Sequence, residues 1–146
     1  MQCKLIELKR QEDIRLVKLL IDKYHLQGCP KGSGMAKHSR FFALECEGYW
    51  VAVCWIHESA PFKPIAIKHK ISLKNTYFIR RICQCAPGQY GVTLLKLLAE
   101  KLKAEGKETL WTLGLTNHSN ALYKKAGFKQ IGTTPRTKHP IFKLQL

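Results

Sequence analysis

The sequence lacks long apolar runs and the usual metal-binding motifs. No stretch approaches the roughly 18 consecutive apolar residues that a membrane helix needs, and residues 1–7 show no signal-peptide core. We therefore expect a cytoplasmic protein without a membrane partner. Because no H-x-x-x-H or C-x-x-C spacing occurs among the six histidines and six cysteines, we predict no metal site.

Acidic residues are scarce, and the charge imbalance is concentrated in one part of the chain. Asp and Glu total 10 against 25 Lys and Arg. Residues 1–58 hold nine basic and seven acidic residues, a balance of +2, whereas residues 59–146 hold 16 and three, a balance of +13. A field of this size attracts polyanions such as nucleic acid or cofactor phosphates, although a lysine-rich surface also serves solubility alone.

The six cysteines occur in a chain without an export signal. Thiols of such proteins stay reduced unless the source is a hyperthermophile, so we expect buried thiols more than a disulfide framework. Cys83 and Cys85 would lie on one face of the same strand, where buried thiols are the expected state.

Length and patterning indicate one domain. A chain of 146 residues with 45% apolar content can bury one sizeable core. Apolar alternation predicts strands at residues 2–8, 40–47, 49–57, 76–84, 109–115, 128–132 and 141–146. Helical spacing predicts helices at residues 12–24, 90–104 and 118–126. Residues 65–75 fit either an irregular basic excursion or an extra strand, and Glu47-Gly48 marks a hairpin turn.

One segment carries a more specific pattern. Residues 119–128, SNALYKKAGF, form a predicted short helix that ends at Gly127 and runs into a strand. This segment resembles the A-x-x-L-Y-x-x-x-G-F pattern of the GCN5-related N-acetyltransferase (GNAT) superfamily, and the predicted element order is similar to that of the superfamily. The resemblance implies one α+β domain over residues 1–146, a mostly antiparallel twisted sheet of about seven strands flanked by helices. It also implies two diverging central strands with acetyl-CoA between them.

The turn before the second long helix is the expected cofactor phosphate site. Pro87 and Gly88 bend the chain at a helix N-terminus, whose free N–H groups and positive dipole end suit a pyrophosphate. The superfamily form of this turn is Q/R-x-x-G-x-G/A, and here Gln89 replaces its central glycine, so that a side chain would crowd the phosphate. The resemblance assigns contacts with coenzyme A to the following residues: Cys83, Cys85, Ala86, Pro87, Gly88, Gln89, Tyr90, Gly91, Asn117, Asn120 and Tyr123.

Tyr123 is the expected catalytic acid. When an amine attacks a thioester, a phenol with an ordinary pKa near ~10 can protonate the expelled thiolate; a half-buried structural tyrosine is the alternative. Glu45 and Glu47 are candidates for the general base because alternation puts both on one strand face. Glu58, at the end of the next predicted strand, is a further candidate.

Shorter matches resemble one branch of the superfamily, the phage DNA-modification protein Mom and its relatives. They include Tyr24-His25-Leu26, residues 39–42, residues 78–82 and residues 127–134. This resemblance implies an acceptor amine on nucleic acid. It assigns contacts with substrate or nucleic acid to the following residues: His25, His38, Arg40, Arg80, Arg81, Lys124 and Lys125.

The sequence therefore predicts an acetyl-CoA-dependent N-acyltransferase, monomeric or homodimeric, whose acceptor is associated with DNA or RNA. Two alternatives stay open. One is a noncatalytic basic module that binds nucleic acid on the same fold, and the other is a small-molecule amine acetyltransferase.

Overall fold

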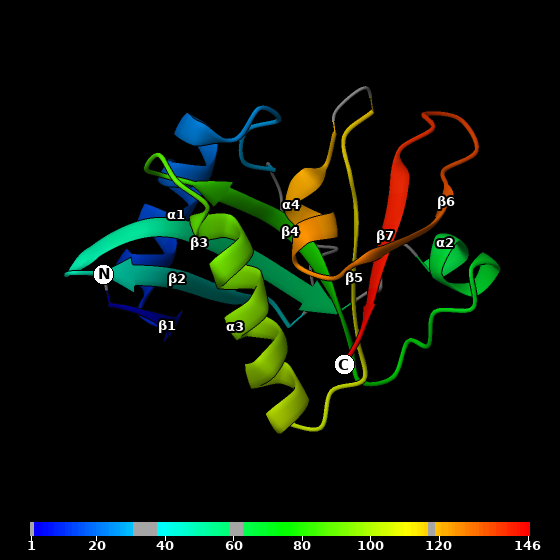
Figure 1. Cartoon of the computed structure of the whole chain (residues 1–146), viewed down its shortest axis with the longest axis horizontal. Helices are drawn as coiled ribbons and strands as arrows, with labels where there is room; N and C mark the ends of the chain where they lie inside the picture. The colour runs from blue at the N-terminus through cyan, green and yellow to red at the C-terminus, as the bar shows by residue number, and fades with distance from the viewer. Residues whose placement is uncertain (1, 31–37, 59–62, 117–118) are drawn as a thin grey trace.

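The computed structural model describes residues 2–30, 38–58, 63–116 and 119–146. The elements follow in the order β1 (Cys3–Leu8), α1 (Gln11–Tyr24), β2 (Arg40–Cys46), β3 (Tyr49–Glu58), α2 (Lys63–Lys68), β4 (Thr76–Gln84), α3 (Tyr90–Ala104), β5 (Thr109–Leu113), α4 (Ala121–Lys125), β6 (Lys129–Thr133) and β7 (Pro140–Gln145). The strands form one seven-stranded sheet in the order β1-β2-β3-β4-β5-β7-β6. β4 and β5 are parallel, and the other five strand pairs are antiparallel. The predicted mixed sheet flanked by helices is thus confirmed (Figure 1).

Alternating side chains give the sheet two apolar faces. Phe42 and Leu44 of β2 pack on the α3 side, whereas their neighbours Phe41 and Ala43 pack with α1 on the opposite side. Figure 1 shows α3 and α4 in front of the sheet and α1 behind it. Helix α3 contributes four fully buried leucines: Leu94, Leu95, Leu98 and Leu102. Burying each such side chain contributes about 1.5–3 kcal/mol, so these leucines hold α3 on the sheet.

The two long helices match their predictions closely. Helix α1 buries Val17 and Ile21 on its sheet-facing side, as expected from the helical spacing of its apolar residues. Helix α3 starts at Tyr90 and ends at Ala104, the bounds that the sequence predicted. Within the described residues, no helix combines the length and the apolarity needed to cross a membrane.

The β2–β3 connection is the predicted hairpin. Cys46 pairs with Tyr49, so Glu47 and Gly48 alone form the loop. Their φ angles are +53° and +85°, and a two-residue loop with positive φ at both positions is a type I′ turn. Gly48 adopts this region without steric cost, which explains why the glycine marked the turn in the sequence.

Strand β4 contains a β-bulge that changes which residues face each helix layer. The pairing with β3 shifts so that Arg80 is the extra residue of β4. As a result Ile79 before the bulge and Ile82 after it both face the α3 side. A bulge increases the local twist and re-aims side chains. Here it turns Arg81 toward the segment after α1, where Arg81 Nε donates to Gly28 O at 3.0 Å.

Residues 63–68 form α2, so both predictions for the stretch from residue 65 were wrong there. The β-branched side chains of Ile65 and Ile67 favoured a strand. In the structure Ala66 is fully buried and packs, together with Ile65, near Phe78 and Trp111. Packing against the sheet therefore outweighs the intrinsic preference of the isoleucines.

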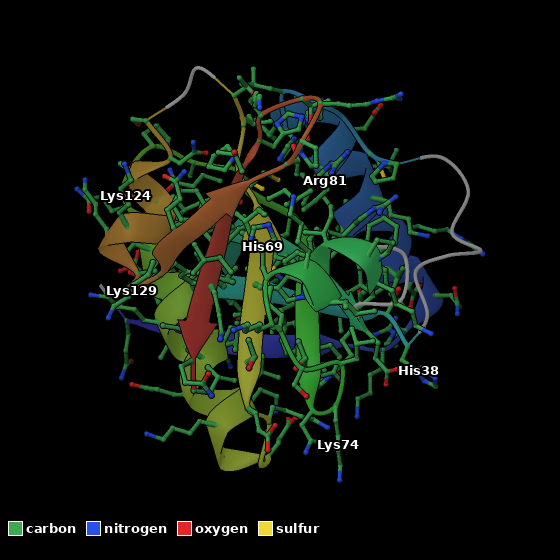
Figure 2. All side chains as sticks on the ribbon, turned by 90° about the vertical axis from the view of Figure 1, so that its right-hand side faces the viewer. His38, His69, Lys74, Arg81, Lys124 and Lys129 are labelled. Atoms are coloured by element: carbon green, nitrogen blue, oxygen red, sulfur yellow. A yellow bond between two sulfur atoms is a disulfide. The ribbon has the colours of Figure 1, made fainter. Side chains whose placement is uncertain are left out.

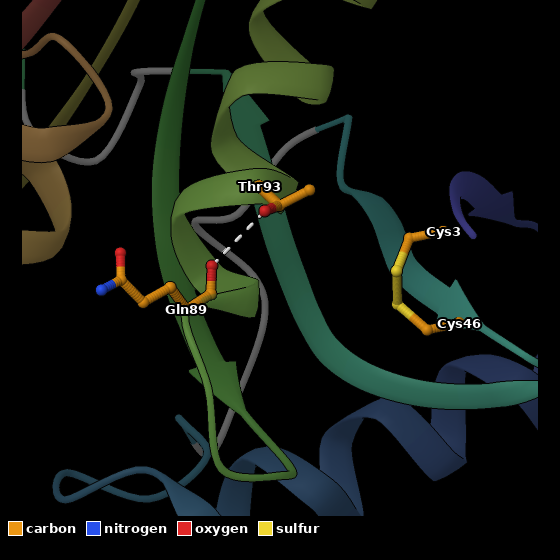
Figure 3. The surroundings of a disulfide bond; sticks show 4 residues. All are labelled: Cys3, Cys46, Gln89 and Thr93. Carbon is orange, nitrogen blue, oxygen red and sulfur yellow. Dashed lines mark hydrogen bonds between the residues drawn. A yellow bond between two sulfur atoms is a disulfide. The ribbon is translucent and has the colours of Figure 1, made fainter. Parts of the chain in front are cut away.

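Cys3 and Cys46 form a disulfide that joins β1 to β2 (Figure 3). This bond is an exception to the expectation of buried thiols more than a disulfide framework, because four of the six cysteines are free. The two residues are direct partners in the β1–β2 ladder, and their Cα atoms are 4.1 Å apart, so strand pairing itself brings the sulfurs together. The remaining cysteines are free thiols, as predicted: Cys29, Cys54, Cys83 and Cys85.

Candidate active site

The parallel strands β4 and β5 separate partway along their length. Their ladder joins residues 76–78 to residues 109–111. Beyond it, Thr112 Oγ1 donates to Ile79 O at 3.0 Å, a side-chain bond that replaces the next backbone bond. A cavity of about 550 Å³ opens beyond this point. The expected divergence of the two central strands is therefore present, and the bulge at Arg80 supplies the added twist that favours it.

The cavity is lined by five parts of the chain. They are the segment after α1, the second half of β4, β5 with its continuation, the start of α4 with the residues just before it, and His139 just before β7. The lining includes His25, Arg81, Thr112, Tyr123 and His139. Segments that are far apart in sequence thus meet at the split in the sheet.

Tyr123 lies on the α4 wall of the cavity. Its ring stacks on Phe142 with centroids 5.3 Å apart and meets the edge of Phe128 at 5.8 Å. Burial raises the pKa of the Tyr123 hydroxyl to about 12, although a hydrogen bond with Thr112 and the charge of Arg81 act in the opposite direction. The phenol is therefore held in its protonated form throughout the neutral pH range.

The turn before α3 is closed by the side chain of Gln84. Gly91 N donates to Gln84 Oε1 at 2.9 Å, and Gln84 Nε2 donates to Gly88 O at 2.6 Å. The amide oxygen of Gln84 thus caps the helix N-terminus, where an acceptor is needed. A Cβ atom at Gly91 would lie 2.9 Å from Leu122 Cδ1. The close contact between α3 and α4 therefore favours a residue without a side chain at position 91.

The concern that Gln89 would crowd a phosphate is not supported by its position. Gln89 is exposed, and Figure 3 shows its side chain extending away from α3. The backbone oxygen of Gln89 accepts a hydrogen bond from Thr93 Oγ1 at 3.4 Å (Figure 3). The end of the turn is therefore anchored through the backbone of Gln89, and its side chain leaves the helix end accessible.

Glu45 and Glu47, the expected candidates for the general base, do not line the cavity, so the structure does not bring them to the site. Both lie at the β2 end of the β2–β3 hairpin, and β3 separates β2 from β4. Glu45 pairs with Lys4 at 3.8 Å, whereas Glu47 lies in the turn and is exposed. The turn also ends the strand alternation that would have put both side chains on one face. Glu58, at the exposed end of β3, does not line the cavity either.

Arg40, which the resemblance assigned to substrate, does not line the cavity and is part of an ion-pair network. Its guanidinium donates to both oxygens of Glu7 at 2.8 and 2.9 Å and to both oxygens of Glu105 at 2.8 and 2.9 Å. Lys101 lies 3.9 Å from Glu7 and 3.6 Å from Glu105. Because bidentate pairs to two carboxylates use most of the five N–H groups of an arginine, Arg40 links β1, β2 and α3.

The other basic residues predicted to contact substrate divide into two groups. His25, Arg80 and Arg81 line the cavity. His38, Lys124 and Lys125 are exposed and do not line it. Figure 2 shows His38 and Lys124 on different parts of the molecule from Arg81.

Of the predicted cofactor contacts outside the turn, Asn120 has a clear structural role. Its Oδ1 accepts from Leu115 N and its Nδ2 donates to Leu115 O, both at 3.0 Å. This pair joins the start of α4 to the end of β5 and forms part of the cavity wall. A Cβ atom at Gly114 would lie 2.7 Å from Asn120 Oδ1, so a glycine is required there. Asn117 lies outside the described residues.

Cys83 and Cys85, which the resemblance assigned to the cofactor, do not line the cavity. They belong to the apolar cluster between α1 and the sheet, on the face opposite α3. Within the described residues, no group of three or more histidines, cysteines or acidic residues could hold a metal ion.

His139 is a cavity residue that sequence reasoning missed. Thr116 Oγ1 donates to Thr137 O at 3.1 Å and lies 3.0 Å from His139 Nδ1. A hydroxyl has one hydrogen and a carbonyl only accepts, so both contacts are satisfied only when His139 Nδ1–H donates to Thr116. The neutral ring then carries its lone pair on Nε2, which is the arrangement of a proton acceptor. No motif surrounds His139, since its partners come from separate loops.

Several solved acetyltransferases share this fold. The ribosomal-protein-S18-alanine N-acetyltransferase from Escherichia coli superposes with a TM-score of 0.68 at 17% identity, over 99% of this chain and 94% of that one. The aminoglycoside acetyltransferase AAC(6')-Ib in complex with coenzyme A gives a TM-score of 0.70 at 13% identity, over 99% and 95%. An N-acetyltransferase from Staphylococcus aureus Mu50 gives 0.69 at 15% identity, over 99% of both chains. The protein therefore has the GNAT fold.

Sequence similarity identifies a nearer relative. No family model matches the chain. Uncharacterized protein 154 of Sulfolobus islandicus rod-shaped virus 1 is 51% identical over 140 residues, which cover 93% of this chain and 91% of the viral protein. The chain belongs to the same family as this viral protein.

Proposed function

We propose that the protein is an acyl-CoA-dependent N-acyltransferase, which transfers an acyl group, with acetyl as the simplest case, directly to an amine. The observation that carries the proposal is the cavity between β4 and β5, which reaches Tyr123. Among the structures with the same fold, AAC(6')-Ib was solved with coenzyme A. Fold alone does not determine function, so the argument depends on the residues of the cavity.

The residues present fit a coenzyme A thioester. The separated strands leave a cavity of about 550 Å³ between β4 and β5, in which an extended pantetheine arm could lie along the strand edges. At the start of α3, Gln84 Oε1 lies 2.9 Å from Gly91 N, so an oxygen acceptor is already accommodated there. A phosphate oxygen would take the place of this amide oxygen, and the positive end of the 15-residue helix would favour its charge. The bound thioester would supply an activated acyl carbonyl and a thiol leaving group.

Tyr123 would stabilise the departing sulfur. Because burial keeps its hydroxyl protonated, the phenol can donate a hydrogen bond to the negative charge that develops there. The rings of Phe128 and Phe142 fix the orientation of the phenol. A donor held in place before the reaction needs no reorganisation during it.

His139 would serve as the general base in place of the glutamates. Its Nδ1–H is committed to Thr116, which leaves Nε2 to take the proton that the amine loses as the C–N bond forms and the C–S bond breaks. Thr116 would be a positioning residue. Its hydroxyl oxygen accepts the Nδ1–H of His139 and thereby fixes the tautomer of the ring.

One observation favours a second candidate, in which the acceptor amine, or the only ligand, is part of a nucleic acid. Residues 59–146 carry a balance of +13, and Lys124 and Lys125 are exposed on α4, the helix whose residues 121–123 line the cavity (Lys124 is labelled in Figure 2). Replacing both lysines with glutamine is expected to reduce the slope of log affinity against log salt by nearly 2 for DNA. An unchanged slope would remove α4 from any nucleic-acid surface.

The proposed function is tested by titrating acetyl-CoA against the full chain. Binding should raise thermal stability, by about 2.7 kcal/mol at a ligand concentration 100 times the dissociation constant, and thiol release should require an added amine. A matched titration with the bare nucleotide 3′,5′-ADP separates phosphate binding from thioester binding. A protein that is stabilised by DNA but not by acetyl-CoA would be a noncatalytic binding module.

A further inference from the structure

We infer that the acceptor is an amine that also carries an anionic group, a carboxylate or a phosphate, and that Arg81 and His25 bind this group in the cavity. The inference rests on the proposed function and names the substrate class of the same site. It depends on the charge of the lining, on the fixed position of Arg81 and on the tautomer of His25.

The described lining of the cavity is positively charged. It contains two arginines, Arg80 and Arg81, and two histidines, His25 and His139, but no aspartate or glutamate among its described residues. A concave site lined by one sign of charge concentrates ligands of the opposite sign. A ligand with a negative charge could pair with Arg81, which has no ion-pair partner among the described residues.

Arg81 is held in place by neutral partners. Its Nε donates to Gly28 O at 3.0 Å and its Nη1 donates to Arg80 O at 2.8 Å. Both acceptors are backbone carbonyls, and none of the ion pairs in the described part of the chain involves Arg81. Arg40 shows the contrast, since two carboxylates neutralise it. The fold provides Arg40 with carboxylate partners but provides none for Arg81 among the described ion pairs. An anion bound at Arg81 would form the corresponding charge-assisted pair there.

The half-buried position of Arg81 makes such a partner valuable. Burial, followed by the repulsion of Arg80, lowers the pKa of the Arg81 guanidinium. A lowered pKa means that the environment disfavours the charge, and an incoming anion would relieve this cost. The charge of Arg81 also acts on the Tyr123 hydroxyl, so the anion would bind in the same cavity as the phenol.

His25 supplies a neutral donor on the same wall. Gln27 N donates to His25 Nδ1 at 3.1 Å, so the proton of the neutral ring must be on Nε2. Burial, with a contribution from Arg81, lowers the pKa of His25 to about 4, and the ring stays neutral near pH 7. The wall formed by His25 and Arg81 thus offers hydrogen-bond donors, whereas His139 offers an acceptor at Nε2.

This arrangement matches a molecule that combines an anion with an amine. Donors on one wall would hold the carboxylate or phosphate, and the acceptor of His139 would take the proton of the amine. The positive wall would also favour the neutral, nucleophilic form of the amine. It would repel a polycation such as kanamycin, which is bound in one structure of AAC(6')-Ib.

The test measures binding by isothermal titration calorimetry, with matched ligand pairs that differ by one anionic group. L-alanine against L-alaninamide tests a carboxylate, adenosine 5′-monophosphate against adenosine tests a phosphate, and kanamycin is the polycation. We expect the anionic member of at least one pair to bind the full chain at least about tenfold more tightly than its neutral partner. The pair that shows the preference identifies the source of the anion. Equal binding within both pairs, no binding by any ligand, or tighter binding of kanamycin would overturn the inference.

Three variants connect the preference to Arg81. Arg81→Gln should abolish it, and Arg81→Lys, which keeps the charge, should restore most of it. Arg15→Gln is the matched control, because it removes the same charge from an exposed position on α1. If Arg81→Gln keeps the preference, or if Arg81→Lys loses it while melting like the unsubstituted protein, Arg81 does not bind the anion through its charge.

Acetyl-CoA binding and thiol release, measured on the same proteins, separate this inference from the proposed function. Anion binding that depends on Arg81 without acetyl-CoA binding would contradict acyl transfer and leave the anion site standing. Acyl transfer to neutral and anionic amines at equal rates would contradict the inference and leave the enzyme standing.

Discussion

Replacing Tyr123 with phenylalanine removes one hydroxyl from the cavity and keeps the ring that packs on Phe128 and Phe142. Burial raises the pKa of this hydroxyl to about 12, so full proton transfer to a thiolate with an ordinary pKa of ~8.5 would be uphill by roughly 5 kcal/mol. The sequence assigns to this phenol, with an ordinary pKa near ~10, the protonation of the expelled thiolate. The structure instead favours a hydrogen-bond donor that stays protonated.

The size of the effect follows from this distinction. A hydrogen bond to a charged group is worth about 1.5–3 kcal/mol, which corresponds to a decrease in kcat of about 10- to 150-fold. The KM for acetyl-CoA should change by less than about threefold, because the bond strengthens only as negative charge develops on the sulfur.

The assay is steady-state thiol release with acetyl-CoA and a saturating amine. Tyr49→Phe is the matched control, because it removes the same hydroxyl from a side chain that is 75% exposed. Thermal melting of both variants checks that each is folded. A kcat for Tyr123→Phe within about twofold of the unsubstituted enzyme, or a loss that appears only in acetyl-CoA binding, would refute this role of the phenol.

Three further predictions concern the base, the disulfide and acid stability. His139→Gln should lower kcat by about 100-fold or more with little change in acetyl-CoA affinity, and an unchanged pH–rate profile would remove His139 as the base. Replacing Cys3 and Cys46 with serine opens a loop with a sequence separation of 43, so urea unfolding should show a loss of about 4 kcal/mol; equal stability of the unsubstituted protein with and without reductant would contradict this. His25 has a folded pKa of about 4 against ~6.5 when unfolded, so its contribution to stability is present above pH 6.5 and is lost as the pH falls from 6.5 toward 4. Between pH 7 and pH 4 the unsubstituted protein should therefore lose about 3 kcal/mol more than His25→Gln, and parallel pH dependence of the two would refute the buried, neutral state of His25.

Local patterns in the sequence predicted most of the sheet. Each of these patterns reflects residues that are close together in the sequence. They are the alternation in β2 and β3, the glycine of the hairpin and the leucine spacing of α3. These signals agree with one another, and the order of elements they define is the observed order except for α2, which they did not predict. The position of Tyr123 beside the split in the sheet was implied by the resemblance of residues 119–128 to the superfamily pattern.

The predictions that were wrong concern residues whose structure depends on contacts between segments that are distant in the sequence. Helix α2 buries Ala66 in a cluster with Phe78 and Trp111, and helix or strand propensity does not report such a distant contact. Arg40 is neutralised by Glu7 and Glu105, which come from β1 and the end of α3.

The same reason explains the errors within the site. His139 acquires its tautomer from Thr116, 23 residues away, on a separate loop. Gln84 belongs to the end of a predicted strand, and only the fold shows that its amide caps α3. The strand pattern pointed to Glu45 and Glu47 as the general base, although both lie outside the cavity lining.

The most direct test of the account is a crystal structure of the protein with bound coenzyme A. The account predicts the pantetheine arm between β4 and β5 and the sulfur within about 3–4 Å of the Tyr123 hydroxyl. It also predicts a diphosphate oxygen at Gly91 N in place of Gln84 Oε1. Coenzyme A bound elsewhere on the chain, with Gln84 still capping α3 and the cavity beside Tyr123 empty, would contradict it.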